Sequence, residues 1–111
     1  MDSKLKWNKK YIERLNHQEQ PTCNERLRRL SSYLTGGLAL DFACGLGANS
    51  LFLGRLGYKV IAYDISEIAI DYLKLQGDKE NLPIIPQAHD LTKTETLDLR
   101  ENSFDLIVIT Y

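Results

Sequence analysis

Two glycines and one downstream aspartate are the residues of this 111-residue chain whose types and spacing best support a binding chemistry. Gly45 and Gly47 allow a tight turn between a strand and a helix, and they let backbone N–H groups approach a ligand without a Cβ clash. The helix after such a turn offers the N–H groups of its first turn to an anionic group such as a carboxylate. Asp64 follows Asp41 by 23 residues, at the end of an apolar run, where a carboxylate can accept hydrogen bonds from both hydroxyl groups of a ribose. The combination of a glycine loop, a following strand and an aspartate at the end of that strand, at this spacing, predicts a nucleoside-type ligand.

Two other nucleotide-binding motifs match the sequence poorly. A dinucleotide-binding loop needs a third glycine, and Ser50 stands at that position. The Gly-Lys-Ser/Thr sequence of a phosphate-binding P-loop occurs nowhere in the chain. Taken singly, the glycines are consistent with a plain strand-to-helix turn, and Asp64 with an acid that precedes a helix cap at Ser66. Only the combination indicates a ligand.

Four short apolar runs predict buried strands. They cover residues 38–42, 59–63, 84–88 and 104–110. Pro86 lies in the third run, which therefore suits the edge of a sheet. Near-continuous apolar strands that alternate with helices are typical of a parallel sheet covered on both faces. We therefore predict a single α/β domain over residues 1–111, with a Rossmann-like core at 37–111 that follows N-terminal helices at 1–36.

Helical patterns surround these strands. A capping-box pattern makes Thr22 the predicted N-cap of a helix that ends at Gly36. Ser66 is the predicted N-cap of a later helix that ends at Gly77. The other helical patterns run from Leu5 to Leu15 and through residues 51–56. Residues 1–30 carry eight basic groups against four acidic ones, which we interpret as solvated helix faces rather than as an arm for an acidic partner.

The segment that contains the glycine loop resembles a known family signature. Asp41-Phe42-Ala43-Cys44-Gly45-Leu46-Gly47 is similar to the D-x-G-x-G-x-G motif of the class I S-adenosylmethionine-dependent methyltransferases. The continuation at 49–53 and 56–58 resembles the small-molecule branch that includes the tellurite-resistance methyltransferases. Ala43 replaces the first glycine, which is a mild change unless this position needs a positive φ. The resemblance extends from about Leu38 to the end of the chain.

The resemblance implies S-adenosyl-L-methionine as the cofactor and gives each matching residue a role. Asp64 would hold the ribose hydroxyls, and Ile65 would pack on the adenine. Asp90 would accept a hydrogen bond from the adenine amino group, and Leu91 would offer backbone polar atoms to the ring, although Asp90 is also consistent with a loop turn. The motif from Asp41 to Gly47 would surround the methionine end. The implied cofactor-binding residues are Asp41, Ala43, Gly45, Gly47, Asp64, Ile65, Asp90 and Leu91.

No residue is predicted to act as a chemical catalyst or as a metal ligand. Cys44 lies in the loop, but no histidine is placed to activate it, so we interpret its thiol as a small side chain that fills space. A sulfonium already carries an activated methyl group, so proximity and orientation can supply much of the rate. The methyl acceptor is predicted to be a small molecule whose identity stays open. Trp7 and Tyr11 are similar to aromatic residues that some relatives place over the substrate pocket, although the packing of an amphipathic helix explains them equally well.

The resemblance also implies a strand order of 3-2-1-4 within a sheet of seven strands, of which this sequence supplies four. Residues 104–110 would then form an apolar edge with unpaired backbone groups. Such an edge invites self-association or pairing with a partner chain. The substrate-recognising half would be missing, so this chain alone is predicted to be inactive and truncated relative to the family fold.

Composition argues against several other classes. The net charge of −1 gives no general attraction to nucleic acid, and no apolar stretch approaches the roughly 20 residues that a membrane span needs. The first residues form no secretory signal, and two cysteines form no disulfide framework, so we expect a cytoplasmic protein. Two alternatives stay open: half of an NAD(P)-dependent oxidoreductase, and a non-catalytic remnant or module that a partner chain completes.

Overall fold

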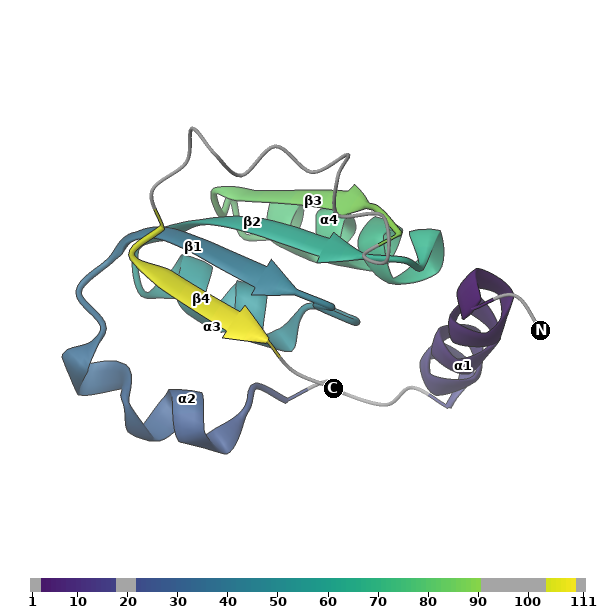
Figure 1. Cartoon of the computed structure of the whole chain (residues 1–111), viewed down its shortest axis with the longest axis horizontal. Coiled ribbons are helices and arrows are strands. Elements are labelled where there is room, and N and C mark those ends of the chain that lie inside the picture. Colours follow the sequence, from purple (N-terminus) through teal and green to yellow (C-terminus); the bar gives the residue numbers. More distant parts are fainter. Residues whose placement is uncertain (1–2, 18–21, 91–103, 110–111) are drawn as a thin grey trace.

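A four-stranded parallel sheet forms the centre of the molecule (Figure 1). The computed structural model describes residues 3–17, 22–90 and 104–109. The order of the strands across the sheet is β3-β2-β1-β4, which confirms the predicted order. Along the chain the elements are α1 (Ser3–Asn16), α2 (Glu25–Arg29), the 3-10 helix η1 (Ser31–Tyr33), β1 (Gly37–Phe42), α3 (Ala48–Arg55), β2 (Tyr58–Asp64), α4 (Glu67–Lys79), β3 (Ile84–Ala88) and β4 (Leu106–Ile109).

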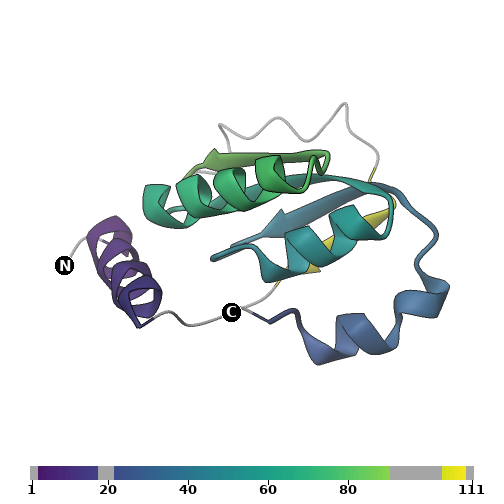
Figure 2. The ribbon, with the colours of Figure 1, turned by 180° about the vertical axis from the view of Figure 1, so that it is seen from behind.

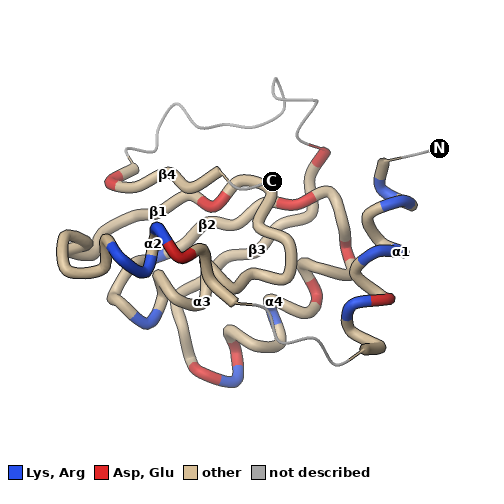
Figure 3. Tube along the Cα trace, turned by 90° about the horizontal axis from the view of Figure 1, so that it is seen from below, with Lys and Arg blue, Asp and Glu red and all other residues tan. Residues whose placement is uncertain are grey.

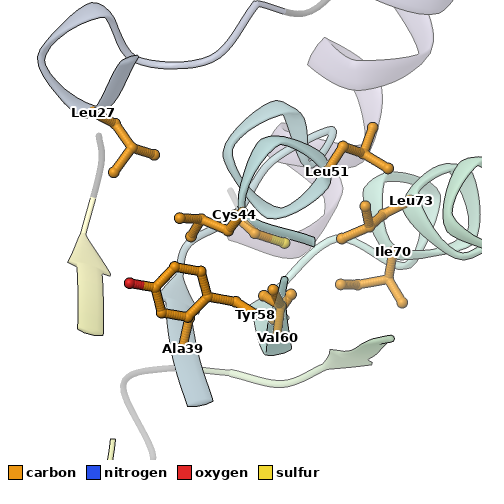
Figure 4. Close-up of a cluster of buried hydrophobic side chains, with 10 residues drawn as sticks. Leu27, Ala39, Cys44, Leu51, Tyr58, Val60, Ile70 and Leu73 are labelled. Carbon is orange, nitrogen blue, oxygen red and sulfur yellow. The ribbon is translucent and has the colours of Figure 1, made fainter. Parts of the chain in front are cut away.

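Helices α3 and α4 cover one face of the sheet (Figure 2). Successive strands β1, β2 and β3 step in one direction, so right-handed crossovers bring both connecting helices to the same side. The core lies between the sheet and these two helices. Ala39 and Val60 of the sheet and Leu73 of α4 are fully buried there (Figure 4). The connection from β3 to β4, residues 91–103, lies outside the described residues.

Strand β3 matches its predicted bounds, and its place in the sheet accounts for its proline. Pro86 pairs with Ala62 on the one neighbouring strand, and β3 has no strand on its other side in the described sheet. Proline lacks a backbone donor, so it is tolerated at such an edge. Strand β4 begins at Leu106 rather than at the predicted residue 104, because Asp105 forms a bend that bonds to Leu38; residue 110 of the predicted range lies outside the described residues. The Asp105 amide donates to the Leu38 carbonyl at 2.8 Å, and its carboxylate accepts from the Leu38 amide at 2.8 Å.

The predicted cap of the second helix is wrong by two residues. Asn24, not Thr22, caps α2, and its side-chain oxygen accepts hydrogen bonds from the backbone amides of Arg26 at 2.9 Å and Leu27 at 3.3 Å. The Asn24 amide in turn donates to the side chain of Asn49, 25 residues further along the chain, at 2.6 Å. This long-range contact fixes the start of α2. The helix ends at Arg29, so it is also shorter than predicted.

The predicted end of α4 is wrong, whereas its predicted start is confirmed. The Ser66 hydroxyl accepts a hydrogen bond from the Ala69 amide at 3.2 Å, as an N-cap does. At the other end, α4 continues past Gly77 to Lys79. A Cβ atom at Gly77 would lie 3.7 Å from Ile84 Cδ1, an ordinary van der Waals distance, so this position lies beside β3 within the helix and does not end it.

Helix α1 lies at the carboxyl ends of β1 and β2, beside the start of α4 (Figure 1). Its one buried residue, Tyr11, packs with Leu46 and Ala69. Figure 3 shows the basic residues of α1, most of which are exposed, in agreement with the predicted solvated face. Among the described residues, no helix is both long enough and apolar enough to cross a bilayer.

Candidate cofactor site

A cavity of about 590 Å³ lies between the carboxyl ends of β1 and β2 and the inner side of α1. One wall consists of the loop after β1, the end of β2 and the start of α3. The opposite wall comes from α1, and residues before α2 complete the rim. The lining residues include Trp7, Lys10, Tyr11, Arg14, Ala43, Gly45, Gly47, Ala48, Asn49, Asp64, Ile65 and Asp90.

The loop after β1 follows a left-handed backbone path at three positions. Ala43, Gly45 and Gly47 have φ values of 56°, 59° and 88°. A Cβ atom at Gly47 would lie 2.3 Å from Leu73 Cδ1, so only glycine fits there. Ala43 therefore occupies a position that does need a positive φ, and the departure from the family motif costs about 1–2 kcal/mol of backbone strain.

Asp64 ties the end of β2 to the glycine loop. Its side chain is 4% exposed and lines the cavity. One carboxylate oxygen accepts from the Gly45 amide at 2.9 Å, and the other accepts from the Ser66 amide at 3.0 Å. Each carboxylate oxygen has more than one acceptor position, so these bonds leave capacity for hydroxyl donors. The loop and the predicted ribose acceptor thus form one hydrogen-bonded unit.

Tyr11 of α1 lies on the opposite wall of the same cavity. Burial raises the pKa of the Tyr11 hydroxyl group well above its ordinary value, and the negative charge of Asp64 and a hydrogen bond with it act in the same direction. The hydroxyl oxygen would lie 3.2 Å from a Cβ atom at Gly45. Tyr11 also stacks on Trp7, with ring centroids 5.7 Å apart.

Asp41 lies beneath the loop and is not among the residues that line the cavity. It is fully buried, and one of its oxygens accepts a hydrogen bond from the Ser50 hydroxyl at 2.7 Å, while Oδ1 has no hydrogen-bond partner among the described residues. Burial raises the pKa of Asp41 to about 6; the Ser50 hydrogen bond opposes this shift and the charge of Asp64 adds to it. The bond to Ser50 holds the first turn of α3 against β1.

The amino-terminal end of α3 opens into the cavity. The N-cap of α3 is Gly47, which has no side chain to accept hydrogen bonds from the first amides of the helix. The next two residues, Ala48 and Asn49, line the cavity. The first amides of a helix have no intrahelical acceptor, so this end is suited to an anionic group.

The remaining predicted residues divide into three groups. Ile65 and Asp90 line the cavity near Asp64, as the cofactor prediction requires, and Leu91 lies outside the described residues. Cys44 is buried in the core and also lines the cavity, and burial raises the pKa of its thiol; its space-filling role stays a prediction. Within residues 3–17, 22–90 and 104–109, no cluster of His, Cys, Asp and Glu could hold a metal ion.

The α1 wall is the part of the site that sequence reasoning largely missed. Trp7, Lys10, Tyr11 and Arg14 recur at helical spacing and all line the cavity. The Lys10 ammonium lies 4.8 Å from the Trp7 ring centroid, and the Arg14 guanidinium lies 5.9 Å from that of Tyr11. The spacing i, i+3, i+4, i+7 was a signal that these residues share one face.

The chain is similar to known proteins over most of its length. Residues 7–111 match the family described as tellurite resistance protein TehB. The probable S-adenosyl-L-methionine-dependent methyltransferase TehB of Haemophilus influenzae is 41% identical over 71 residues, which are 64% of this chain and 23% of that protein. A ubiquinone biosynthesis O-methyltransferase of Bradyrhizobium diazoefficiens is 36% identical over 97 residues, which are 86% of this chain and 37% of that protein.

Solved structures agree with these matches. The crystal structure of TehB from Haemophilus influenzae superposes with a TM-score of 0.73 at 27% identity and covers 95% of this chain and 34% of its own. A TehB-like methyltransferase from Corynebacterium glutamicum, at 24% identity, shares the fold with a TM-score of 0.70. The chain thus spans about a quarter to a third of the length of the curated relatives that it matches. The predicted resemblance is confirmed, and the chain belongs to the TehB family of S-adenosylmethionine-dependent methyltransferases.

Proposed function

We propose that this chain is the cofactor-binding part of a methyltransferase that transfers a methyl group from S-adenosyl-L-methionine to a small molecule. The observation that carries the proposal is the joining of Asp64, the glycine loop and the open end of α3 around one cavity. The O-methyltransferase and TehB names of the relatives support the same reaction class.

The residues of the cavity fit the cofactor in chemical terms. Asp64, nearly buried and already oriented by two backbone amides, supplies acceptors for ribose hydroxyls. Ile65 offers an apolar surface to the adenine, and Asp90 an acceptor beside it. The amides at the start of α3, at Ala48 and Asn49, suit the methionine carboxylate.

The chemistry of the transfer would come from the cofactor, which carries a methyl group on a sulfonium. The residues of this chain would bind and orient it, and they would exclude water from the reacting centre. Burial of Asp64 and closure of the cavity by α1 serve this purpose. No described side chain is assigned a proton-transfer role, since rate can come from proximity and in-line orientation.

Binding of S-adenosylhomocysteine to the purified chain, measured by calorimetry, tests the proposal. Asp64→Ala should weaken binding at least tenfold, because each lost charge-assisted hydrogen bond contributes about 1.5–3 kcal/mol. Asp71→Ala, an exposed aspartate on α4, is the matched control and should bind like the unmodified chain. Equal affinity of all three chains would refute the assignment of Asp64.

The oxidoreductase alternative is tested in the same experiment with NADH as the ligand. Ser50 argues against it, because the position of the third glycine carries a fully buried hydroxyl that bonds to Asp41. Binding of NADH and not of S-adenosylhomocysteine would favour that alternative.

We also propose that the outer edge of β4, which has no neighbouring strand in the described part of the sheet, mediates self-association of this chain. Ile107 and Ile109 are 55% and 57% exposed, which is unusual for apolar residues of a parallel sheet. A dimer in light scattering that Ile107→Lys converts to monomer would support this association, and a monomer at high concentration would refute it.

A cytoplasmic location is proposed on the ground that both cysteines, Cys23 and Cys44, are free thiols.

A further inference from the structure

Helix α1 brings positive charge to the wall of the cavity that faces the glycine loop. Lys10 and Arg14, one helical turn apart, both line the cavity. The charged residues that line it at the ends of the strands, Asp64 and Asp90, are acidic. The cavity therefore has an acidic side and a basic side. A matching ligand carries hydrogen-bond donors for the first and an anionic group for the second.

The aromatic rings of α1 orient these two cations. The Lys10 ammonium lies 4.8 Å from the centroid of the Trp7 ring, and the Arg14 guanidinium lies 5.9 Å from that of Tyr11. The two rings stack on each other, and Tyr11 is buried, so the rings are fixed by the fold. A cation that a ring already attracts loses less side-chain freedom when an anion binds.

The first half of α1 lies beside the adenosine end of the proposed site. The Lys4 ammonium pairs with Glu67, and the Ser66 hydroxyl donates to Asn8 Oδ1. Ser66 and Glu67 begin α4 and follow Asp64, the proposed ribose acceptor, within three residues. These contacts hold the first half of α1 next to the end of β2 (Figure 1).

The second half of α1 extends past the glycine loop toward the methionine end. The Tyr11 hydroxyl oxygen lies 3.2 Å from the Cβ position of Gly45. Arg14 is three residues beyond Tyr11, about 4.5 Å further along the helix axis, and its side chain is half-buried. The start of α3, at Ala48 and Asn49, lines the same cavity. Arg14 therefore faces the end of the cavity where the methionine carboxylate is proposed to bind.

The carboxylate is the group of the proposed cofactor that complements a guanidinium. The sulfonium and the ammonium of the cofactor are positive and repel it. The ribose and the adenine are proposed to bind at Asp64, Ile65 and Asp90, beside the other half of α1. A guanidinium can donate two parallel hydrogen bonds to one carboxylate, which gives both affinity and a fixed direction.

We propose that Arg14 is a carboxylate-binding residue of the cofactor site and holds the methionine chain of S-adenosyl-L-methionine against the start of α3. This inference rests on the proposed function and adds to it a residue outside the glycine loop and Asp64 that selects ligands by their carboxylate. Lys10, which is exposed, adds positive charge to the same wall. Because the chain is held at its far end, the sulfonium and its methyl group are oriented as well.

Calorimetry with two ligands that differ in the carboxylate alone tests this assignment. The ligands are S-adenosylhomocysteine and its decarboxylated analogue, S-adenosyl-3-thiopropylamine. Arg14→Gln should weaken binding of S-adenosylhomocysteine about tenfold or more, because charge-assisted hydrogen bonds are lost. It should change binding of the analogue by less than about twofold, because the analogue has no carboxylate to lose. Equal losses for the two ligands, or no loss for S-adenosylhomocysteine, would overturn the inference.

Two further variants sharpen the test. Lys9→Gln is the matched control, since it removes an exposed positive charge from the same helix at a position that does not line the cavity, and it should bind both ligands like the unmodified chain. Arg14→Lys keeps the charge but not the pair of parallel donors, so its loss with S-adenosylhomocysteine should be smaller than that of Arg14→Gln. Normal binding of the analogue shows that a variant has kept its fold.

These outcomes separate the inference from the proposed function. If the unmodified chain binds S-adenosylhomocysteine, Asp64→Ala does not, and Arg14→Gln binds as tightly as the unmodified chain, the cofactor site is supported and the role of Arg14 is refuted. If the unmodified chain binds neither ligand, the cofactor site fails and the role of Arg14 fails with it.

Discussion

Replacement of Gly47 by alanine tests the most constrained point of the cofactor loop. Two separate costs are expected. The residue has a φ of 88°, and an L side chain in the left-handed region costs about 1–2 kcal/mol. The new Cβ would also lie 2.3 Å from Cδ1 of Leu73, a fully buried residue of the core, and overpacking of this kind costs about 1–3 kcal/mol.

The sum predicts that Gly47→Ala lowers the free energy of unfolding by about 2–4 kcal/mol, after allowance for the lower chain entropy of alanine in the unfolded state. Domains of this size have total stabilities of about 5–15 kcal/mol, so the loss should be readily measured. Urea unfolding followed by circular dichroism is the assay. With a slope of about 2 kcal/mol per molar urea, the midpoint should fall by about 1–2 M.

Gly57→Ala is the matched control, because it separates the two costs. Gly57 has a φ of 99°, but a Cβ atom there would meet nothing within 4 Å. The free energy of unfolding of Gly57→Ala should therefore fall only by the cost of backbone strain, about 1 kcal/mol. If the two variants lose equal stability, the contact with Leu73 contributes nothing and the packing argument for this loop is refuted.

Three further predictions concern the same region. The pKa of Asp41 is raised from 3.8 to about 6 in the folded protein, so the folded state binds the proton more tightly than the unfolded chain does. The free energy of unfolding should therefore fall by about 3 kcal/mol as pH rises from 3 to 7. Asp41→Asn should flatten this dependence in urea unfolding at a series of pH values, and parallel curves for the two chains would refute it. Ala43→Gly should raise the free energy of unfolding by up to about 1 kcal/mol, because relief of the left-handed strain exceeds the added freedom of the unfolded chain; a thermal melt that shows destabilisation would contradict this. Iodoacetamide should modify the half-buried Cys23 well before the buried Cys44, whose pKa burial raises, and mass spectrometry of the alkylated peptides would show the opposite order if this is wrong.

Local signals in the sequence were sufficient for the sheet and for one wall of the site. The strand order, the bounds of β3 and the Ser66 cap depend on apolar runs and short-range capping, which are visible within a few residues. The cavity lining at Gly45, Gly47 and Asp64 follows from the rule that ligands bind at the carboxyl ends of parallel strands.

The errors have long-range causes. Asn24 caps α2 in place of Thr22 because the side chain of Asn49, distant in sequence, bonds to its amide. Helix α4 continues through Gly77, which lies beside Ile84 of β3, to Lys79. The sequence left two interpretations open for Trp7 and Tyr11: packing of α1 on the domain, or a place at the pocket. The structure combines them, because Tyr11 packs with Leu46 and Ala69 and also lines the cavity. The helical spacing of the α1 residues indicates that they share one face, but it does not indicate which part of the fold that face meets.

The strand order has a consequence for how the chain folds. Strands β1, β2 and β3 with their two helices are continuous in sequence from Gly37 to Ala88, so each contact between neighbours closes a short segment. Strand β4 must instead return across the sheet to pair with β1, and the bond between Leu38 and Asp105 spans 67 residues. Such long-range pairing forms late because the loss of chain entropy precedes the gain from contacts. On the ribosome, the glycine loop and Asp64 can therefore come together while β4 is still being synthesised. The residues proposed to bind the cofactor would then be in place before the sheet is complete.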